Sequence, residues 1–210
     1  MAENPKPISR PPSISLGGFV EFASAMSSGR IIAVQNVIAN EFGDYEPSHD
    51  FYRQFRKAIG EGIANGNDDV RVRQAVTACN PKRRDHYEAL AAGWMGWRRG
   101  KRLEVFSQPR EWHNVGLEVR VSPQFIWHDR KDSYLVWPYL KGPVPSRDGI
   151  QAAIRLIETT HQDSRLTPAV LDVRRGKLHK ATRRRRGFDA WLTSEAAAFI
   201  SLLESIRNVA

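Results

Sequence analysis

The stretches VGLEVRVSPQFIW (residues 115–127) and SYLVWPYLK (residues 133–141) decide the fold class of this chain. From residue 115 to residue 121 every second residue is apolar, and glycine or a charged residue stands between, which predicts a half-buried strand. Residues 124–128 extend or partner this strand. The second stretch predicts another long strand, which Gly142 and Pro143 close.

The sequence after these strands predicts a helix, two more strands and a final helix. Ser146 is placed to cap a helix whose apolar residues recur at helical spacing up to Ile157. Residues 168–174 predict a strand, and Gly176 turns the chain into a further strand over residues 177–181. The last helix begins at about Ser194. We expect the hairpin of the first two strands, the helix and the returning strand to form one mixed sheet with a right-handed crossover.

The sequence before Lys101 has helical periodicity instead, with apolar residues spaced at three and four positions. It predicts five helices, of which the first is capped by Ser15 and the third by Ser48; together they span residues 15–29, 31–42, 48–65, 70–79 and 87–100. The fold class is therefore α/β (α+β), a mixed β-sheet core with flanking helices, preceded by a helical N-terminal lobe. We expect residues 1–14 to be an extended Pro-rich tail, residues 15–100 the lobe, and residues 101–210 the α/β core, packed with the lobe as one compact unit.

Composition and charge restrict the function. The 210 residues are 41% hydrophobic, which excludes collagen-like and wholly disordered chains. Lys and Arg number 32 against 23 Asp and Glu, a net charge of +9 that favours polyanionic partners, nucleic acid first. Cys79 is the one cysteine, so no internal disulfide and no thiolate-rich zinc site can form, and we expect a reducing compartment, the cytoplasm. No apolar run is long enough to cross a membrane.

Basic residues are densest between residues 174 and 186, where no acid interrupts them. Arginine grips phosphate well because its planar fork donates two parallel hydrogen bonds. We therefore predict a nucleic-acid contact, DNA or RNA, made mainly to the backbone by Arg174, Arg175, Lys177, Lys180, Arg183, Arg184, Arg185 and Arg186. Shorter basic clusters lie at residues 82–84 and 98–102.

The order strand, strand, helix, strand after a helical lead-in resembles the PD-(D/E)XK nuclease superfamily. In that family one strand carries a metal-binding Asp, the next an acidic residue two positions before a Lys, and the following helix opens with a Gln. By this resemblance Lys141 and Gln151 are candidate catalytic residues. Gln124, however, stands at the Asp position and Tyr139 at the acidic position. A Mg²⁺ site of this kind needs clustered carboxylates, and neutral Gln and Tyr side chains cannot supply their negative charge. The resemblance therefore implies an inactive nuclease-like core that needs no cofactor.

Two alternatives remain open. An active metal-dependent nuclease would use Mg²⁺ bound by rearranged carboxylates, for which Glu118 and Asp172 are the candidates. A protein–protein adaptor within a larger complex would use the Arg-rich segment against an acidic subunit. His113, His128 and Asp129 lie near one another in the sequence but match no metal-binding template. Pro138 lacks an N–H for a strand ladder, so we expect a bulge or an edge strand at its position.

Overall fold

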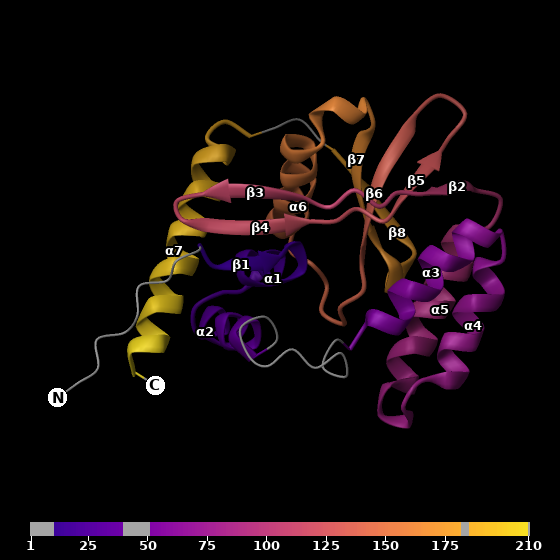
Figure 1. Ribbon diagram of the computed structural model, residues 1–210, viewed down its shortest axis with the longest axis horizontal. Coiled ribbons are helices and arrows are strands. Elements are labelled where there is room, and N and C mark those ends of the chain that lie inside the picture. The colour runs from indigo at the N-terminus through magenta and orange to yellow at the C-terminus, as the bar shows by residue number, and fades with distance from the viewer. Residues whose placement is uncertain (1–10, 40–50, 182–184, 210) are drawn as a thin grey trace.

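The computed structural model describes residues 11–39, 51–181 and 185–209, and these form a mixed α+β fold with two β-sheets. Figure 1 shows the three-stranded sheet crossing the molecule between α7 on one side and the second sheet on the other. Helices α1 and α2 lie along the three-stranded sheet, and α3, α4 and α5 form a bundle at the opposite end of the molecule. The predicted fold class is thus confirmed.

The three-stranded sheet has the order β1-β4-β3, and the five-stranded sheet has the order β2-β5-β6-β7-β8. The strands are β1 (Ser13–Ser15), β2 (Arg102–Val105), β3 (Arg110–Asn114), β4 (Leu117–Val121), β5 (Phe125–His128), β6 (Ser133–Tyr139), β7 (Thr167–Asp172) and β8 (Lys177–Lys180). The helices are α1 (Leu16–Ser24), α2 (Ser28–Val37), α3 (Arg53–Asn65), α4 (Asp68–Ala78), α5 (Arg84–Arg98), α6 (Arg147–Thr160) and α7 (Phe188–Val209).

The expectation of a single sheet is wrong, and two prolines explain why. Strands β2 and β3 run antiparallel to β5 and β4, so that residues 102–128 make one long hairpin. Pro109 and Pro123 lie where this hairpin passes from one sheet to the other, and neither can donate a ladder hydrogen bond. The two arms stay adjacent at the break, because the Phe106 N–H donates to the Gln124 carbonyl at 2.9 Å. Residues 125–128 therefore pair with β6 and do not extend β4.

Each face of the five-stranded sheet carries a hydrophobic core. One cluster, on the α1, α6 and α7 side, includes Phe22, Leu135 and Phe199. The other, under α3 and α5, includes Tyr87, Trp94, Val136 and Leu171. Burial on both faces explains why residues 133–141 show no polar alternation. The helices of the expected N-terminal lobe divide between the clusters, with α1 and α2 in the first and α3–α5 in the second.

Helix ends follow local capping chemistry. The side chains of Ser15 and Ser146 accept hydrogen bonds from the backbone three residues on, as the sequence predicts for N-caps. Helix α1 ends at Ser24, earlier than expected, because Ala25 is extended. Helix α7 begins at Phe188, earlier than expected, with Phe188 and Leu192 buried. The Ser48 cap lies outside the described residues.

Pro138 sits in β6, the middle strand of the five-stranded sheet. It pairs with Leu171 of β7 on one side. On the other side the ladder with β5 extends only to Val136. The strand is therefore central, but Pro138 itself lies at a local edge, where its missing N–H interrupts no pairing with β5.

Helix α5 packs closely against the turn that follows β7. An added Cβ at Gly93 would lie 1.9 Å from the Val173 carbonyl oxygen, so no larger residue fits there without moving the backbone. None of the described helices is both long and apolar enough to traverse a bilayer.

Two glycine variants of α5 test this packing. We expect Gly93→Ala to lower the free energy of unfolding by about 3 kcal/mol, because its methyl group would overlap backbone atoms of residues 173 and 174. Gly96→Ala, on the same helix, meets no atom within 4 Å and should raise stability by up to about 1 kcal/mol through helix propensity. Urea unfolding of both variants checks the pair. Equal stabilities would show that α5 does not dock through Gly93.

Candidate functional site

A cleft of about 1510 Å³ opens at the break in the long hairpin. Its walls are the start of α1, the first turns of α3, the hairpin break at residues 105–109 and 122–124, and the carboxyl end of β6 with residues 140–143. Strands β6 and β7 are parallel, and Tyr139 pairs with Asp172 at their shared carboxyl edge. Ligands of open α/β sheets bind outside this edge of the strands, so the cleft is the candidate functional site.

The charged residues that line the cleft come from distant parts of the chain. Among the described lining residues the cations are Arg56 of α3, Arg120 of β4, Lys141 and Arg207 of α7, and the one carboxylate is Glu21 of α1. Lys141 forms an ion pair with Glu21, and both side chains are about a third exposed, at 31% and 33%. Glu21 also accepts a hydrogen bond of 3.4 Å from the Asn36 amide. The pair ties α1 to the end of β6.

Aromatic side chains form the floor of the cleft beside this ion pair. Tyr139 is buried and donates its hydroxyl to the Pro143 carbonyl at 3.1 Å. Burial, together with the negative charges of Glu21 and Asp172, raises the pKa of Tyr139 to about 12. Burial likewise raises the pKa of Tyr52. Both phenols therefore stay protonated at neutral pH, and neither is poised to act as a base. The Trp137 ring lies 6.0 Å from that of Tyr139.

Gln124 brings a polar group into the cleft that its surroundings leave unsatisfied. Its side-chain oxygen is buried and, among the described residues, has no hydrogen-bond donor. Gln124 lines the cleft together with Tyr139 and Lys141, so three of the four positions that the nuclease resemblance singled out lie around one space, whereas the fourth, Gln151, does not line it.

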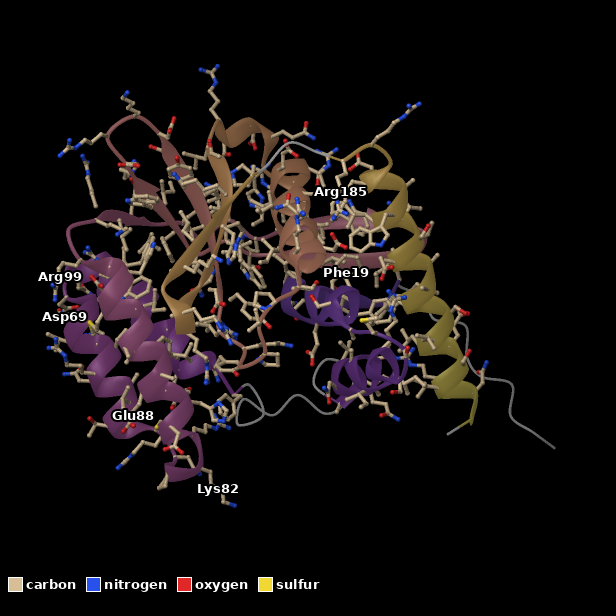
Figure 2. All side chains as sticks on the ribbon, turned by 180° about the vertical axis from the view of Figure 1, so that it is seen from behind. Phe19, Asp69, Lys82, Glu88, Arg99 and Arg185 are labelled. Atoms are coloured by element: carbon tan, nitrogen blue, oxygen red, sulfur yellow. The ribbon has the colours of Figure 1, made fainter. Side chains whose placement is uncertain are left out.

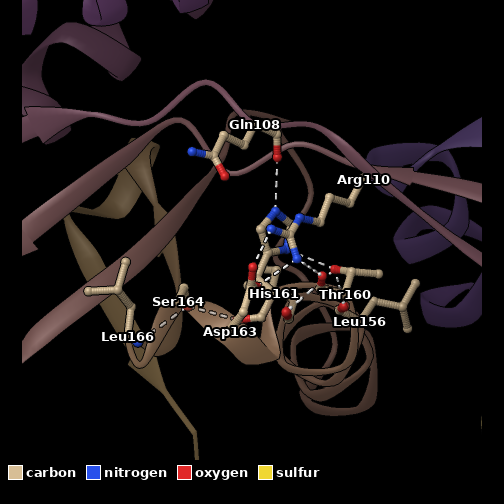
Figure 3. A network of polar contacts seen from close by, with 9 residues as sticks. Gln108, Arg110, Leu156, Thr160, His161, Asp163, Ser164 and Leu166 are labelled. Atoms are coloured by element: carbon tan, nitrogen blue, oxygen red, sulfur yellow. Dashed lines mark hydrogen bonds and ion pairs between the residues drawn. The ribbon is translucent and has the colours of Figure 1, made fainter.

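The loop at residues 106–109 forms one wall of the cleft, and a polar network holds it in place (Figure 3). His161, which is buried at the end of α6, contacts the Gln108 carbonyl at 2.9 Å and the Thr160 hydroxyl at 2.8 Å. Beside it the Arg110 guanidinium donates to both carboxylate oxygens of Asp163 and to the Thr160 carbonyl. The wall is thus fixed to α6 and does not depend on packing alone.

The four candidate catalytic residues do not converge. Lys141 pairs with Glu21 in the cleft. Asp172 is 1% exposed and accepts two hydrogen bonds from Arg175. Glu118 lies in the other sheet, 3.8 Å from His113. Gln151 lies in α6 and is not among the residues that line the cleft. In the part of the chain that the structure describes, one group of three metal-ligating side chains occurs, and it contains Glu118 but not Asp172.

The predicted basic segment is not a row of solvated cations. Arg175 pairs with Asp172 and donates to the Gly142 carbonyl at the rim of the cleft, and Arg174 contacts His86 at 2.9 Å. Lys180 donates to the Tyr134 hydroxyl at 2.7 Å and lies over the Tyr134 ring, and Arg185 pairs with Asp148. Lys177 and Arg186 are exposed. Arg183 and Arg184 lie outside the described residues.

The basic clusters occupy separate surfaces. Figure 2 shows Lys82 and Arg99 on the helical bundle and Arg185 on the far side of the molecule, beside α6 and α7. Arg98 is committed to buried Asp68, which also accepts a hydrogen bond of 3.0 Å from Trp94. The described residues of the three clusters therefore do not share one basic face.

Sequence reasoning did not find Glu21, Arg56, Arg120 or Arg207. Only Glu21 left a local signal, since it is the one charged residue of an otherwise apolar helix, LGGFVEFAS. The others are ordinary surface cations in sequence, and only the fold places them around one cleft.

Comparison with known proteins adds no identification: no protein-family model matches the chain, and no curated protein sequence matches it significantly.

The Arg175–Asp172 pair gives a direct test of whether Arg175 is structural. We expect Arg175→Ala to lower the free energy of unfolding by about 3 kcal/mol, at the low end for a buried pair because the Arg175 side chain is 33% exposed. The physical reason is the carboxylate of Asp172, which would stay buried without its cation. Arg186→Ala, an exposed arginine of the same segment, should change stability by less than about 0.5 kcal/mol. Chemical unfolding measures both, and an Arg175→Ala protein as stable as the parent would refute the structural role.

Proposed function

We propose that the chain binds nucleic acid in this cleft and contacts the phosphate backbone there. The observation that carries the proposal is the described lining, which contains one carboxylate and four cations, three of them from helices or strands (α3, β4 and α7) and one, Lys141, from the segment after β6. Among the described lining residues, cationic side chains thus outnumber carboxylates, which gives the cleft a basic character. Phosphate oxygens are the ligands that guanidinium groups bind best.

The dimensions of the cleft favour a polymer over a small metabolite. Pockets for small molecules usually hold about 300–1,000 Å³, whereas this cleft, at about 1510 Å³, is larger. Tyr52, Trp137 and Phe106 in its lining offer ring faces on which bases can stack. Single-stranded nucleic acid fits these features best, because proteins that bind it usually stack aromatic side chains on its bases and contact its backbone with basic side chains.

Binding without cleavage is the activity we propose. The two positions at which the resembled nucleases carry metal-binding acids are Gln124 and Tyr139, and both line the cleft as uncharged groups. The order β5, β6, α6, β7 supports the resemblance to the PD-(D/E)XK fold. Together these features support a degenerate nuclease-like core, and the near absence of cysteine supports a cytoplasmic location.

The Arg-rich segment contributes at the edge of this site. Arg175 reaches the Gly142 carbonyl at the rim of the cleft, and the charge of Arg174 acts on Tyr52 in the lining. Lys177 and Arg186 are exposed and can add phosphate contacts beyond the rim. We place the main contact in the cleft because its cations come from distant parts of the chain and gather around one space.

Salt-dependent binding of a fluorescently labelled single-stranded DNA tests the proposal. The variant with Arg56→Gln, Arg120→Gln and Arg207→Gln should bind more weakly, because fewer cations neutralise the backbone. Its slope of log affinity against log salt should be shallower by about 0.7 for each phosphate that the variant no longer neutralises. The measurement is fluorescence anisotropy over a range of salt concentrations.

The matched control removes three exposed cations outside the cleft, through Arg71→Gln, Lys82→Gln and Arg130→Gln. It changes the net charge equally, so a reduction in the slope confined to the first variant would place the contact in the cleft. Equal effects of the two variants would mean that binding follows total charge alone. A loss of binding only on replacing Arg183, Arg184, Arg185 and Arg186 by Ala would move the site to the Arg-rich segment.

A further inference from the structure

The hairpin of β3 and β4 carries a second feature that the proposed cleft does not use. In this hairpin Trp112 and Val119 face the core, whereas Glu111 and His113 of β3 and Glu118 of β4 face outward. Glu111 and His113 are two residues apart and so share a face of the strand. His113 stands directly opposite Glu118 in the ladder.

Three ligand atoms meet on this outward face. One ring nitrogen of His113 and one carboxylate oxygen each of Glu111 and Glu118 all lie within 4.8 Å of one another, and His113 Nδ1 is 3.8 Å from Glu118 Oε2. Ligand atoms around a tetrahedral zinc ion are about 3.4 Å apart, given bond lengths near 2.1 Å. The His113 side chain is 60% exposed, so small rotations of exposed side chains can close the difference.

The backbone beneath these side chains is held in register. A two-residue turn joins the strands, and both of its residues, Val115 and Gly116, have positive φ, at 40° and 78°. Turns of this kind match the twist of a hairpin and fix its register. Strand β1 pairs with the other edge of β4, with Ser13 opposite Glu118. The three ligands thus stand on a rigid platform of three strands.

The charges around this platform favour a cation. Two carboxylates share the site, and their mutual repulsion falls when a cation binds between them. Arg120 stands opposite Glu111 on the same face and offsets part of this negative charge, so two carboxylates stand against one arginine there. Arg110, next along β3, is committed to Asp163 on the other side of the sheet.

The geometry points to a metal site formed by Glu111, His113 and Glu118, selective for Zn²⁺ and similar transition-metal ions. An imidazole nitrogen combined with two carboxylates suits Zn²⁺, whereas Mg²⁺ and Ca²⁺ prefer oxygen ligands alone. Three protein ligands leave at least one coordination position for water or for an anion. The inference does not rest on the nucleic-acid proposal, since none of the three ligands lines the cleft.

Isothermal titration of the purified, metal-stripped protein with ZnCl₂ tests this site. The parent should bind Zn²⁺ and should not respond to MgCl₂. His113→Ala and Glu118→Gln should each weaken Zn²⁺ binding by at least about 100-fold, because even groups that only hydrogen-bond to a metal ligand are worth roughly 10- to 100-fold in affinity. Zinc should raise the melting temperature of the parent and of neither variant.

The control is a second outward His–Glu pair, His128 and Glu104, whose atoms lie 3.0 Å apart but which, among the described residues, has no third ligand. His128→Ala should leave Zn²⁺ binding unchanged. Circular dichroism shows whether each variant is folded. Absence of Zn²⁺ binding to the parent would overturn the inference. So would binding that is unchanged in His113→Ala, because the ion would then be held elsewhere.

Discussion

The long hairpin of residues 102–128 cannot run unbroken through one sheet, and most of the architecture depends on that constraint. Pro109 and Pro123 stand almost opposite each other, and neither has an N–H to give to a ladder. The arms therefore separate into β2 with β5 and β3 with β4. Strand β1 pairs with β4 to complete the three-stranded sheet. Phe22 of α1 and Phe199 of α7 are buried in the core beside this sheet.

The same break creates the cleft. Residues 105–109 and 122–124 leave the sheets at the break, so no strand fills the space beside them. These residues line the cleft. The carboxyl end of β6 reaches this point just where its ladder with β5 ends. The Lys141–Glu21 pair and the His161 network then hold the surrounding elements in place. Both the division into two sheets and the candidate site thus follow from Pro109 and Pro123, which have no backbone N–H to donate.

Part of this could be predicted from the sequence. The change of period near Lys101 indicated the strands that follow it but not β1, and Ser15 and Ser146 located two helix starts, because capping and periodicity are local properties. The division into two sheets was not predicted from Pro109 and Pro123. The effect of these prolines depends on which strands pair, and the local sequence does not show the pairing. Lys141 and Glu21 are 120 positions apart, and nothing local connects them. The basic segment contains no acid, so the sequence suggested that its cations are unpaired. In the structure, Asp172 pairs with Arg175 and Asp148 pairs with Arg185, and both acids lie outside the segment.

Ultraviolet crosslinking of the protein to single-stranded DNA, followed by mass spectrometry of the attached peptides, tests the central claim most directly. The claim is that the strand lies in the cleft, over Tyr52 and Trp137. The account predicts crosslinks in peptides that contain residues 51–56 and 137–143. Crosslinks confined to residues 177–186, or to the helical bundle around Lys82 and Arg99, would contradict it.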